Sequence, residues 1–149
     1  GGVYGDKVSA MERFCTNFHR LPNSVKSRLT VENDDKATMY SVVDLYEGVY
    51  KVIGIPIVFD YHHHRFNTGG LSEEDALEVA ISTWGDVVPV VHYSESRNIE
   101  QEDDKIRPQA HSDYVYDYID TYGNEVDIMV EAKAKELAVL KYKEVHGIL

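Results

Sequence analysis

Residues 55–60, Ile-Pro-Ile-Val-Phe-Asp, form a continuous apolar run that ends at the carboxylate of Asp60. A run without polar alternation is typical of a strand buried on both faces, as in a parallel sheet covered by helices. Similar runs lie on either side of it: residues 28–31 before Glu32, 87–91 before His92 and 126–130 before Glu131. The sequence therefore predicts four strands in a parallel α/β arrangement.

Helical patterns separate these strands. Apolar residues recur at helical spacing over residues 8–18, 42–53, 76–84 and 132–145. Ser41 with Asp44, and Ser72 with Asp75, predict helix starts of the capping-box type, and Gly54 predicts a C-terminal cap. We expect a further short helix over residues 112–122 and the longest loop over residues 95–110. The 149 residues are expected to form a single α/β domain, residues 1–149.

Composition limits the classes of function. No apolar run approaches the roughly 20 residues needed to cross a bilayer, so no membrane partner is expected. The single cysteine, Cys15, lies on a helical apolar stripe, which predicts a core residue and fits a reducing cytoplasm. Residues 1–7 have neither the basic nor the apolar region of a signal peptide, and the start without methionine predicts that an upstream segment is missing. The net charge of −11 opposes simple nucleic-acid binding unless bound cations reverse it locally.

Each predicted strand ends in a residue that can bind a metal: Glu32, Asp60, His92 and Glu131. In a β/α barrel the C-terminal strand ends converge on one mouth, where active sites lie. Mixed carboxylate and imidazole ligands suit Mn²⁺, Zn²⁺ or Fe²⁺, and the lack of cysteine ligands argues against structural zinc. Ions clustered in this way favour displacement at phosphate.

Histidines near these strand ends extend the candidate set. Strand alternation would place His62 on the same face as Asp60, but a turn there would select His63 instead, so spacing leaves both open. His111, which follows the long loop, is either a ligand at the same mouth or a surface residue. His19 and His146 lie on predicted helices, and we expect both at the surface.

Together these segments resemble the UV damage endonuclease family. The resemblance follows the family's motif order over nearly the whole chain. Its motifs are Gly1-Gly2-Val3-Tyr4-Gly5-Asp6-Lys7, Leu29-Thr30-Val31-Glu32-Asn33-Asp34-Asp35, Phe59-Asp60-Tyr61-His62-His63-His64, His92-Tyr93-Ser94, His111-Ser112-Asp113-Tyr114-Val115 and Asp127-Ile128-Met129-Val130-Glu131-Ala132-Lys133.

The resemblance implies a TIM-type β/α barrel that nicks damaged double-stranded DNA immediately 5′ to UV photoproducts and abasic sites. It implies divalent metal, foremost Mn²⁺, with Zn²⁺, Mg²⁺ or Fe²⁺ as alternatives. It assigns catalytic roles to Glu32 and to Lys7, the latter near the substrate phosphates. By motif, the implied metal ligands are Glu32, Asp60, His63, His92, His111 and Glu131.

Two departures from the family pattern stand out. The family's lysine two residues before the histidine of His92-Tyr93-Ser94, which becomes carboxylated and bridges metals, is replaced by Val90. The family's first half, which supplies further histidine ligands, is absent. The chain therefore resembles the C-terminal half of a barrel. Half a barrel leaves two unpaired strand edges, so we expect completion by a homodimer or by pairing with the missing N-terminal half.

Two other functions compete with the endonuclease. Sugar isomerases and epimerases use similar barrels and ligands, but need a lysine or histidine beside the metal for proton transfer. A non-catalytic metal-binding fragment is favoured by Val90 and by the missing half.

Overall fold

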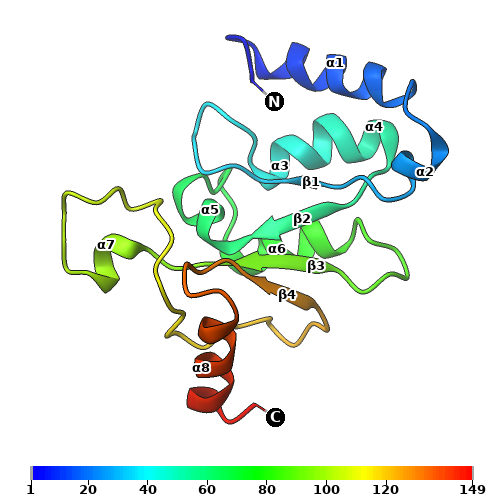
Figure 1. The fold of residues 1–149 in the computed structure, drawn as a ribbon. Coiled ribbons are helices and arrows are strands. Elements are labelled where there is room, and N and C mark those ends of the chain that lie inside the picture. Colours follow the sequence, from blue (N-terminus) through cyan, green and yellow to red (C-terminus); the bar gives the residue numbers. More distant parts are fainter. Residues whose placement is uncertain (1, 149) are drawn as a thin grey trace.

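The computed structural model describes residues 2–148, and Gly1 of the glycine-rich start lies outside this range. Its centre is one parallel sheet of four strands in the order β1-β2-β3-β4 (Figure 1). The strands are β1 (Val31–Glu32), β2 (Ile57–Asp60), β3 (Val90–Tyr93) and β4 (Asp127–Val130). The sequential strand order confirms the predicted α/β architecture, because each strand pairs in parallel with its neighbour in the chain.

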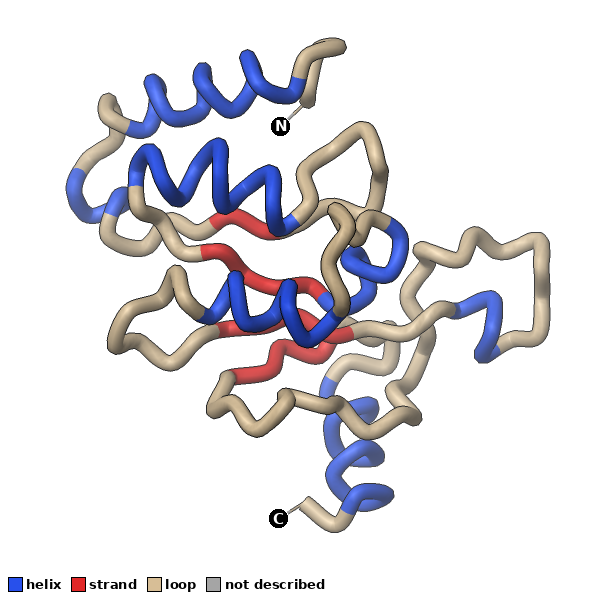
Figure 2. Tube along the Cα trace, turned by 180° about the vertical axis from the view of Figure 1, so that it is seen from behind, coloured by secondary structure: helices blue, strands red, loops and turns tan. Residues whose placement is uncertain are grey.

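Helices connect the strands and cover the sheet. They are α1 (Lys7–Phe18), α2 (Asn23–Lys26), α3 (Val42–Leu45), the π-helical turn η1 (Tyr46–Tyr50), α4 (Lys51–Ile53), α5 (Tyr61–Phe66), α6 (Glu73–Ile81), α7 (Arg97–Glu100) and α8 (Glu136–His146). α3 and α6 contact β2 and each other, so they lie on the same face of the sheet, as Figure 2 shows from behind.

The core confirms the predicted apolar pattern. All four residues of β2 are buried, and Val42, Leu45 and Leu77 pack into the same cluster. Cys15 is a buried free thiol within it. The helix signals were also correct. Ser41 and Asp44 form a full capping box, and Gly54 ends the helix with φ of 72°.

All four strands start later than expected, and the difference is largest for β1 and β3. Residues 28 and 29 donate their amides to the carbonyl of Val25, which continues the turn of α2 and leaves β1 only two residues. Val87 and Val88 are exposed, and the amide of Val87 closes a turn onto the carbonyl of Trp84. Pro89 has no amide to donate, so β3 begins after it.

The helix predicted over residues 112–122 is wrong. The amides of this segment bond to carboxylates instead of to carbonyls four residues earlier: Glu100 accepts from Asp113 and Tyr114, and Glu95 accepts from Tyr116 and Asp117. Two acids from the preceding loop thereby hold the segment extended. That loop itself contains the short α7, and α8 begins at Glu136, four residues after its predicted start.

The sheet is covered unevenly. Within residues 2–148, β1 pairs only with β2, and β4 pairs only with β3. β4 alternates exposed and half-buried residues, and Met129 is 53% exposed. The inner side of this sheet therefore carries apolar surface that the described chain does not cover. No helix within the described range is long and apolar enough to cross a membrane.

Candidate metal centre

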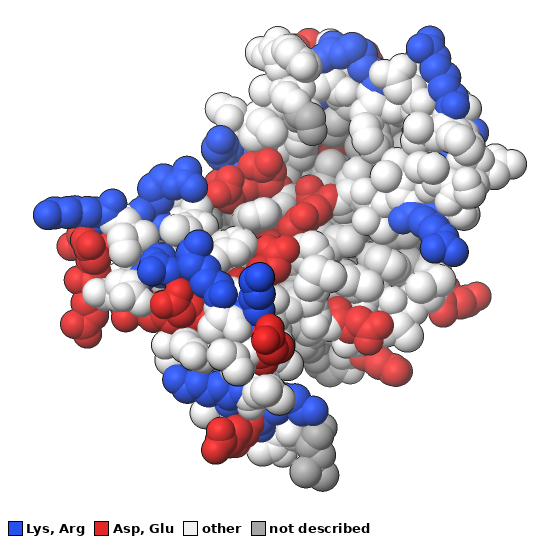
Figure 3. Space-filling view, in the orientation of Figure 1, with Lys and Arg blue, Asp and Glu red and all other residues white. Residues whose placement is uncertain are grey.

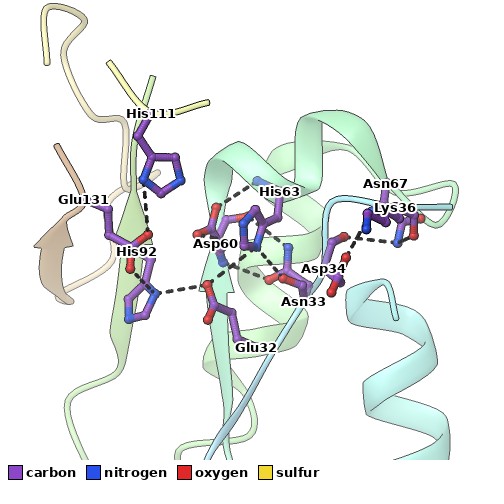
Figure 4. Close-up of polar contacts among 10 residues, drawn as sticks. All are labelled: Glu32, Asn33, Asp34, Lys36, Asp60, His63, Asn67, His92, His111 and Glu131. Carbon is purple, nitrogen blue, oxygen red and sulfur yellow. Dashed lines mark hydrogen bonds and ion pairs between the residues drawn. The ribbon is translucent and has the colours of Figure 1, made fainter. Parts of the chain in front are cut away.

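The carboxyl ends of the four strands bring the predicted ligands together. Asp60 and His92 are register partners across β2 and β3, while Glu32 ends β1. Glu131 extends the ladder just past β4, since its amide donates to the carbonyl of Tyr93 over 2.9 Å. Figure 4 shows these side chains turned toward one another from neighbouring strands. Residues separated by whole β/α units thus share one centre.

His92 links the two outer carboxylates. Its Nδ1 lies 3.1 Å from Oε1 of Glu32 and 3.4 Å from Oε1 of Glu131 (Figure 4). The hydrogen bond to Glu32 raises the pKa of His92, and burial lowers it by less. The pKa of His92 therefore lies above its ordinary value. Burial raises the pKa of Glu32, but the contact with His92 more than offsets it and the pKa ends below its usual range.

Asp60 lies at the middle of the centre. It is fully buried and caps α5 by accepting from the amide of His63 over 2.8 Å. Its second oxygen, Oδ2, has no hydrogen-bond partner among the described residues. Burial raises the pKa of Asp60 to about 7, and neighbouring Glu32 adds to the shift. The imidazole of His63, whose Nδ1 lies 3.6 Å from Oδ2, offsets only part of this effect, so a further positive charge would stabilise the buried carboxylate.

α5 decides which histidine faces the centre. Because the helix begins at Tyr61, directly after its cap, His63 returns toward Asp60 and Glu32, and its Nδ1 lies 3.6 Å from an oxygen of each. His62 points elsewhere. Its ring is fully buried, edge-on to the rings of Phe66 and His111, and burial lowers its pKa to about 4.

Asn33 is a structural residue of the centre that the sequence did not single out. Its buried side chain accepts from the Asp60 amide over 2.8 Å and donates to the Asp60 carbonyl over 2.9 Å, which ties the end of β1 to the end of β2. Its own carbonyl lies 2.8 Å from Nδ1 of His63. Donation from Nδ1 leaves Nε2 of a neutral His63 unprotonated, the tautomer common in metal-binding histidines. The only signal in the sequence was its place directly after a strand-end carboxylate.

His111 joins the centre through Glu131. Its Nδ1 lies 3.8 Å from Oε2 of that carboxylate, and burial lowers its pKa. An antiparallel bridge between Ser96 and His111 holds the backbone here. Of the six implied ligands, His111 is the one that belongs to neither group of close ligand atoms, and its ion-pair contact is with Glu131.

Lys7 and Val90 occupy different surroundings. The Lys7 ammonium donates to Asp44 over 2.7 Å and to the carbonyl of Met39 over 2.9 Å, so its recorded contacts are with α3 and the loop before it. Val90 lies two residues before His92 on the same face of β3, half-buried. A lysine in its place would extend toward the centre.

The donor set fits divalent cations. Two groups have ligand atoms within 4.8 Å of one another, Glu32 with Asp60 and His63, and Asp60 with His92 and Glu131. Three carboxylates and two imidazoles in this arrangement match the oxygen and nitrogen ligands of Mn²⁺, Fe²⁺ or Zn²⁺. Asp60 belongs to both groups, and its Oδ2, which has no hydrogen-bond partner among the described residues, is an atom that a cation would satisfy.

Comparisons with known proteins agree with this geometry. A family model described as UV-endonuclease UvdE matches residues 1–148. The chain is 39% identical to a protein named UV DNA damage endonuclease from Bacillus pumilus (strain SAFR-032), over 97% of this chain and 46% of that protein. It is 36% identical to a protein of the same name from Bacillus cereus (strain Q1), over 95% of this chain and 45% of that protein.

A solved structure gives the same picture. The crystal structure of SacUVDE matches with a TM-score of 0.80 and 32% identity, covering 100% of this chain and 50% of that one. The chain thus spans about half the length of the relatives it matches.

Proposed function

Because this chain belongs to the UV-endonuclease UvdE family, we propose that it forms half of a metal-dependent DNA repair endonuclease that nicks damaged duplex DNA. Following the family resemblance, the cut lies immediately 5′ to UV photoproducts and abasic sites. The single observation that carries the proposal is the gathering of Glu32, Asp60, His63, His92 and Glu131 at one end of a half-barrel.

We propose that Glu32, Asp60, His63, His92, His111 and Glu131 hold the metal, with Mn²⁺ the first candidate. Divalent ions held by these residues would supply Lewis-acid activation of water and charge stabilisation for a phosphate displacement. The chain's own part is preorganisation. Asp60 is fixed by its cap and by Asn33, and His63 is held in one tautomer by the Asn33 carbonyl.

Completion of the barrel is the second part of the proposal. The open edges of β1 and β4 and the exposed Met129 call for a partner that adds strands. A second copy of the chain, or an N-terminal half like the one present in the longer relatives, supplies them. Size-exclusion chromatography with light scattering at micromolar concentration checks this, and a stable monomer would count against the homodimer.

Lys7 remains a proposed phosphate contact. Its pairing with Asp44 keeps the ammonium ordered, and DNA would have to compete for it. If Lys7 contacts substrate, Lys7→Met lowers nicking while Asp44→Asn, which frees the ammonium, does not. Equal losses of nicking and of thermal stability in both variants would assign the pair to folding alone.

Nicking of UV-irradiated supercoiled plasmid tests the function directly. With Mn²⁺, the chain should relax irradiated plasmid faster than an unirradiated control, and Asp60→Asn should abolish the difference. No relaxation by a dimeric, metal-loaded sample would overturn the proposal for this chain.

A non-catalytic metal-binding role is the competing function, and Val90 favours it because the family's lysine is missing there. Elemental analysis and plasmid nicking together separate the two. Nicking with at least one ion per chain supports the endonuclease, whereas less than one ion per chain, or metal-loaded protein that does not nick, supports the non-catalytic role.

A further inference from the structure

A groove beside the metal centre has a charge character unlike the rest of the chain. It has a volume of about 810 Å³ and is lined on one side by His111 and Glu131, two of the proposed ligands. Arg107, Lys133 and Lys135 line it as well, together with a second carboxylate, Glu136. The groove therefore opens onto the centre and carries three cations against two carboxylates in a chain whose net charge is −11.

These three cations are free to bind an anion. All three side chains are exposed, and none is in an ion pair within residues 2–148. Arg97, which belongs to the same loop region, differs because Asp113 neutralises it over 2.7 Å. Figure 3 shows Lys and Arg side chains gathered over the α7 loop, next to Asp and Glu side chains in the hollow. Glu131 and Glu136 line the same groove, but neither forms an ion pair with these cations within the described range.

The backbone that presents the two lysines is rigid and strained. The amide of Lys133 donates to the carbonyl of Ser112, and that of Ala134 donates to the carbonyl of Asp113, each over 3.0 Å. Lys135 has φ of 52° and ψ of −125°, a conformation that is strained for a non-glycine residue. Such strain persists only where surrounding contacts enforce it. Here the enforced turn directly follows Glu131 and connects it to α8.

We propose that this groove binds the DNA backbone, with Arg107, Lys133 and Lys135 contacting phosphates on the strand that enters the metal centre. The inference rests on the proposed function for the identity of the polyanion. Phosphate contacts from lysine and arginine position a duplex without reading its sequence. That suits an enzyme that must act at lesions in any sequence.

Duplex binding in the absence of metal tests the groove separately from catalysis. The probe is a short fluorescein-labelled duplex with one abasic site, followed by fluorescence anisotropy in EDTA at several salt concentrations. Lys133→Ala/Lys135→Ala should weaken binding about tenfold at low salt and flatten the slope of log K against log salt by about 1 for each lost contact. Arg107→Ala should act in the same direction.

The matched control removes the same charge elsewhere. Arg20→Ala/Arg28→Ala deletes two exposed cations, and Arg28 lies beyond the opposite end of the strands in a different cavity. This variant should bind the duplex within about twofold of the unmodified chain, because phosphate contacts require proximity and not net charge alone. Circular dichroism and metal content confirm that each variant folds.

The outcomes separate the two proposals. If the groove variants bind the duplex as the unmodified chain does, or if the unmodified chain binds no duplex at low salt, the groove inference is overturned even where plasmid nicking succeeds. If the variants lose duplex binding but nicking never occurs, the groove stands and the nuclease proposal fails. Unchanged DNA affinity with altered self-association in light scattering would make the groove a protein interface and overturn the inference.

Discussion

Asp60 and His92 are direct register partners in β2 and β3, yet only Asp60 belongs to both groups of ligand atoms. His92 reaches the outer carboxylates, whereas Asp60 sits buried between the groups with one oxygen bare. The centre is therefore two overlapping sites built around one carboxylate, and the sharpest test of the arrangement is to neutralise that carboxylate.

Asp60→Asn should remove metal from both groups. With Mn²⁺ at 100 times its dissociation constant, the unmodified protein gains about 2.7 kcal/mol of unfolding free energy, and the variant should gain almost none. The metal-free variant should be at least as stable as the metal-free parent, because an amide needs no charge compensation in a buried site. Thermal unfolding with and without Mn²⁺ measures both, and Asp104→Asn on an exposed loop is the control. A variant that still gains metal stability would refute the shared role.

Asn33→Ala should loosen the centre without removing a ligand. The buried amide and carbonyl of Asp60 lose their partners, which costs about 2 kcal/mol of unfolding free energy. Metal affinity should fall about 10- to 100-fold, since Asn33 orients both Asp60 and His63. Isothermal titration with Mn²⁺ checks the second effect. Asn124→Ala, which loses bonds to Glu78 and Thr121 far from the centre, should leave metal affinity intact.

Asp44 gives a pH-dependent contribution to stability. Burial raises its pKa, but the bonds from Lys7 and Ser41 outweigh burial and hold the pKa below the ordinary value of 3.8. A carboxyl with a lowered folded-state pKa stabilises the fold above its unfolded pKa, and that contribution disappears as pH falls through the folded value. Asp44→Asn should therefore lower the free energy of unfolding at pH 6, and the difference from the parent should vanish well below pH 3.8.

Urea unfolding across this pH range measures the Asp44 contribution. Asp75→Asn is the control, because Asp75 bonds with the Ser72 hydroxyl as Asp44 does with that of Ser41, but accepts no bond from the Ser72 amide and has no lysine partner among the described residues. Its loss at neutral pH should be smaller. Equal losses for both variants would show that Lys7 adds nothing to the cap.

Val90→Lys should increase the metal content. Val90 lies on the same face of β3 as His92, so a lysine there places its amine at the floor of the acidic centre. By the family resemblance, that amine becomes carboxylated and adds an anionic ligand. Elemental analysis in bicarbonate buffer should show more Mn²⁺ per chain than in the parent, while Val88→Lys, at an exposed position, should show no gain. Equal metal content in both variants would mean that Val90 does not limit the number of ions that the centre binds.

The sequence predicted most of the fold because its signals were local. The capping residue Ser41 and the apolar run that ends at Asp60 need no distant partner to be recognised. The π-helical turn has no signal in the local pattern; α1 packs so closely against it that a Cβ on Gly48 would meet Sδ of Met11 at 2.5 Å. The false helix at residues 112–122 failed because two distant glutamates take its amides.

The residues of the candidate site also fall into those that local sequence signals predicted and those whose place depends on the fold. Strand-end position identified Glu32, Asp60, His92 and Glu131 from the sequence alone. It left His62 and His63 open, because the choice depends on α5 starting at Tyr61. The role of Asn33 could not be predicted from the sequence, because its side chain bonds to the backbone of β2, which lies next to β1 only in the folded chain.

The two ligand groups draw on different portions of the chain. Glu32, Asp60 and His63 come from β1, β2 and α5, while His92 and Glu131 are added by β3 and β4. A shortened chain that stopped before β3 would keep every donor of the first group and only Asp60 of the second. The first ion thus needs the units of β1 and β2, and a second ion needs those of β3 and β4 in addition.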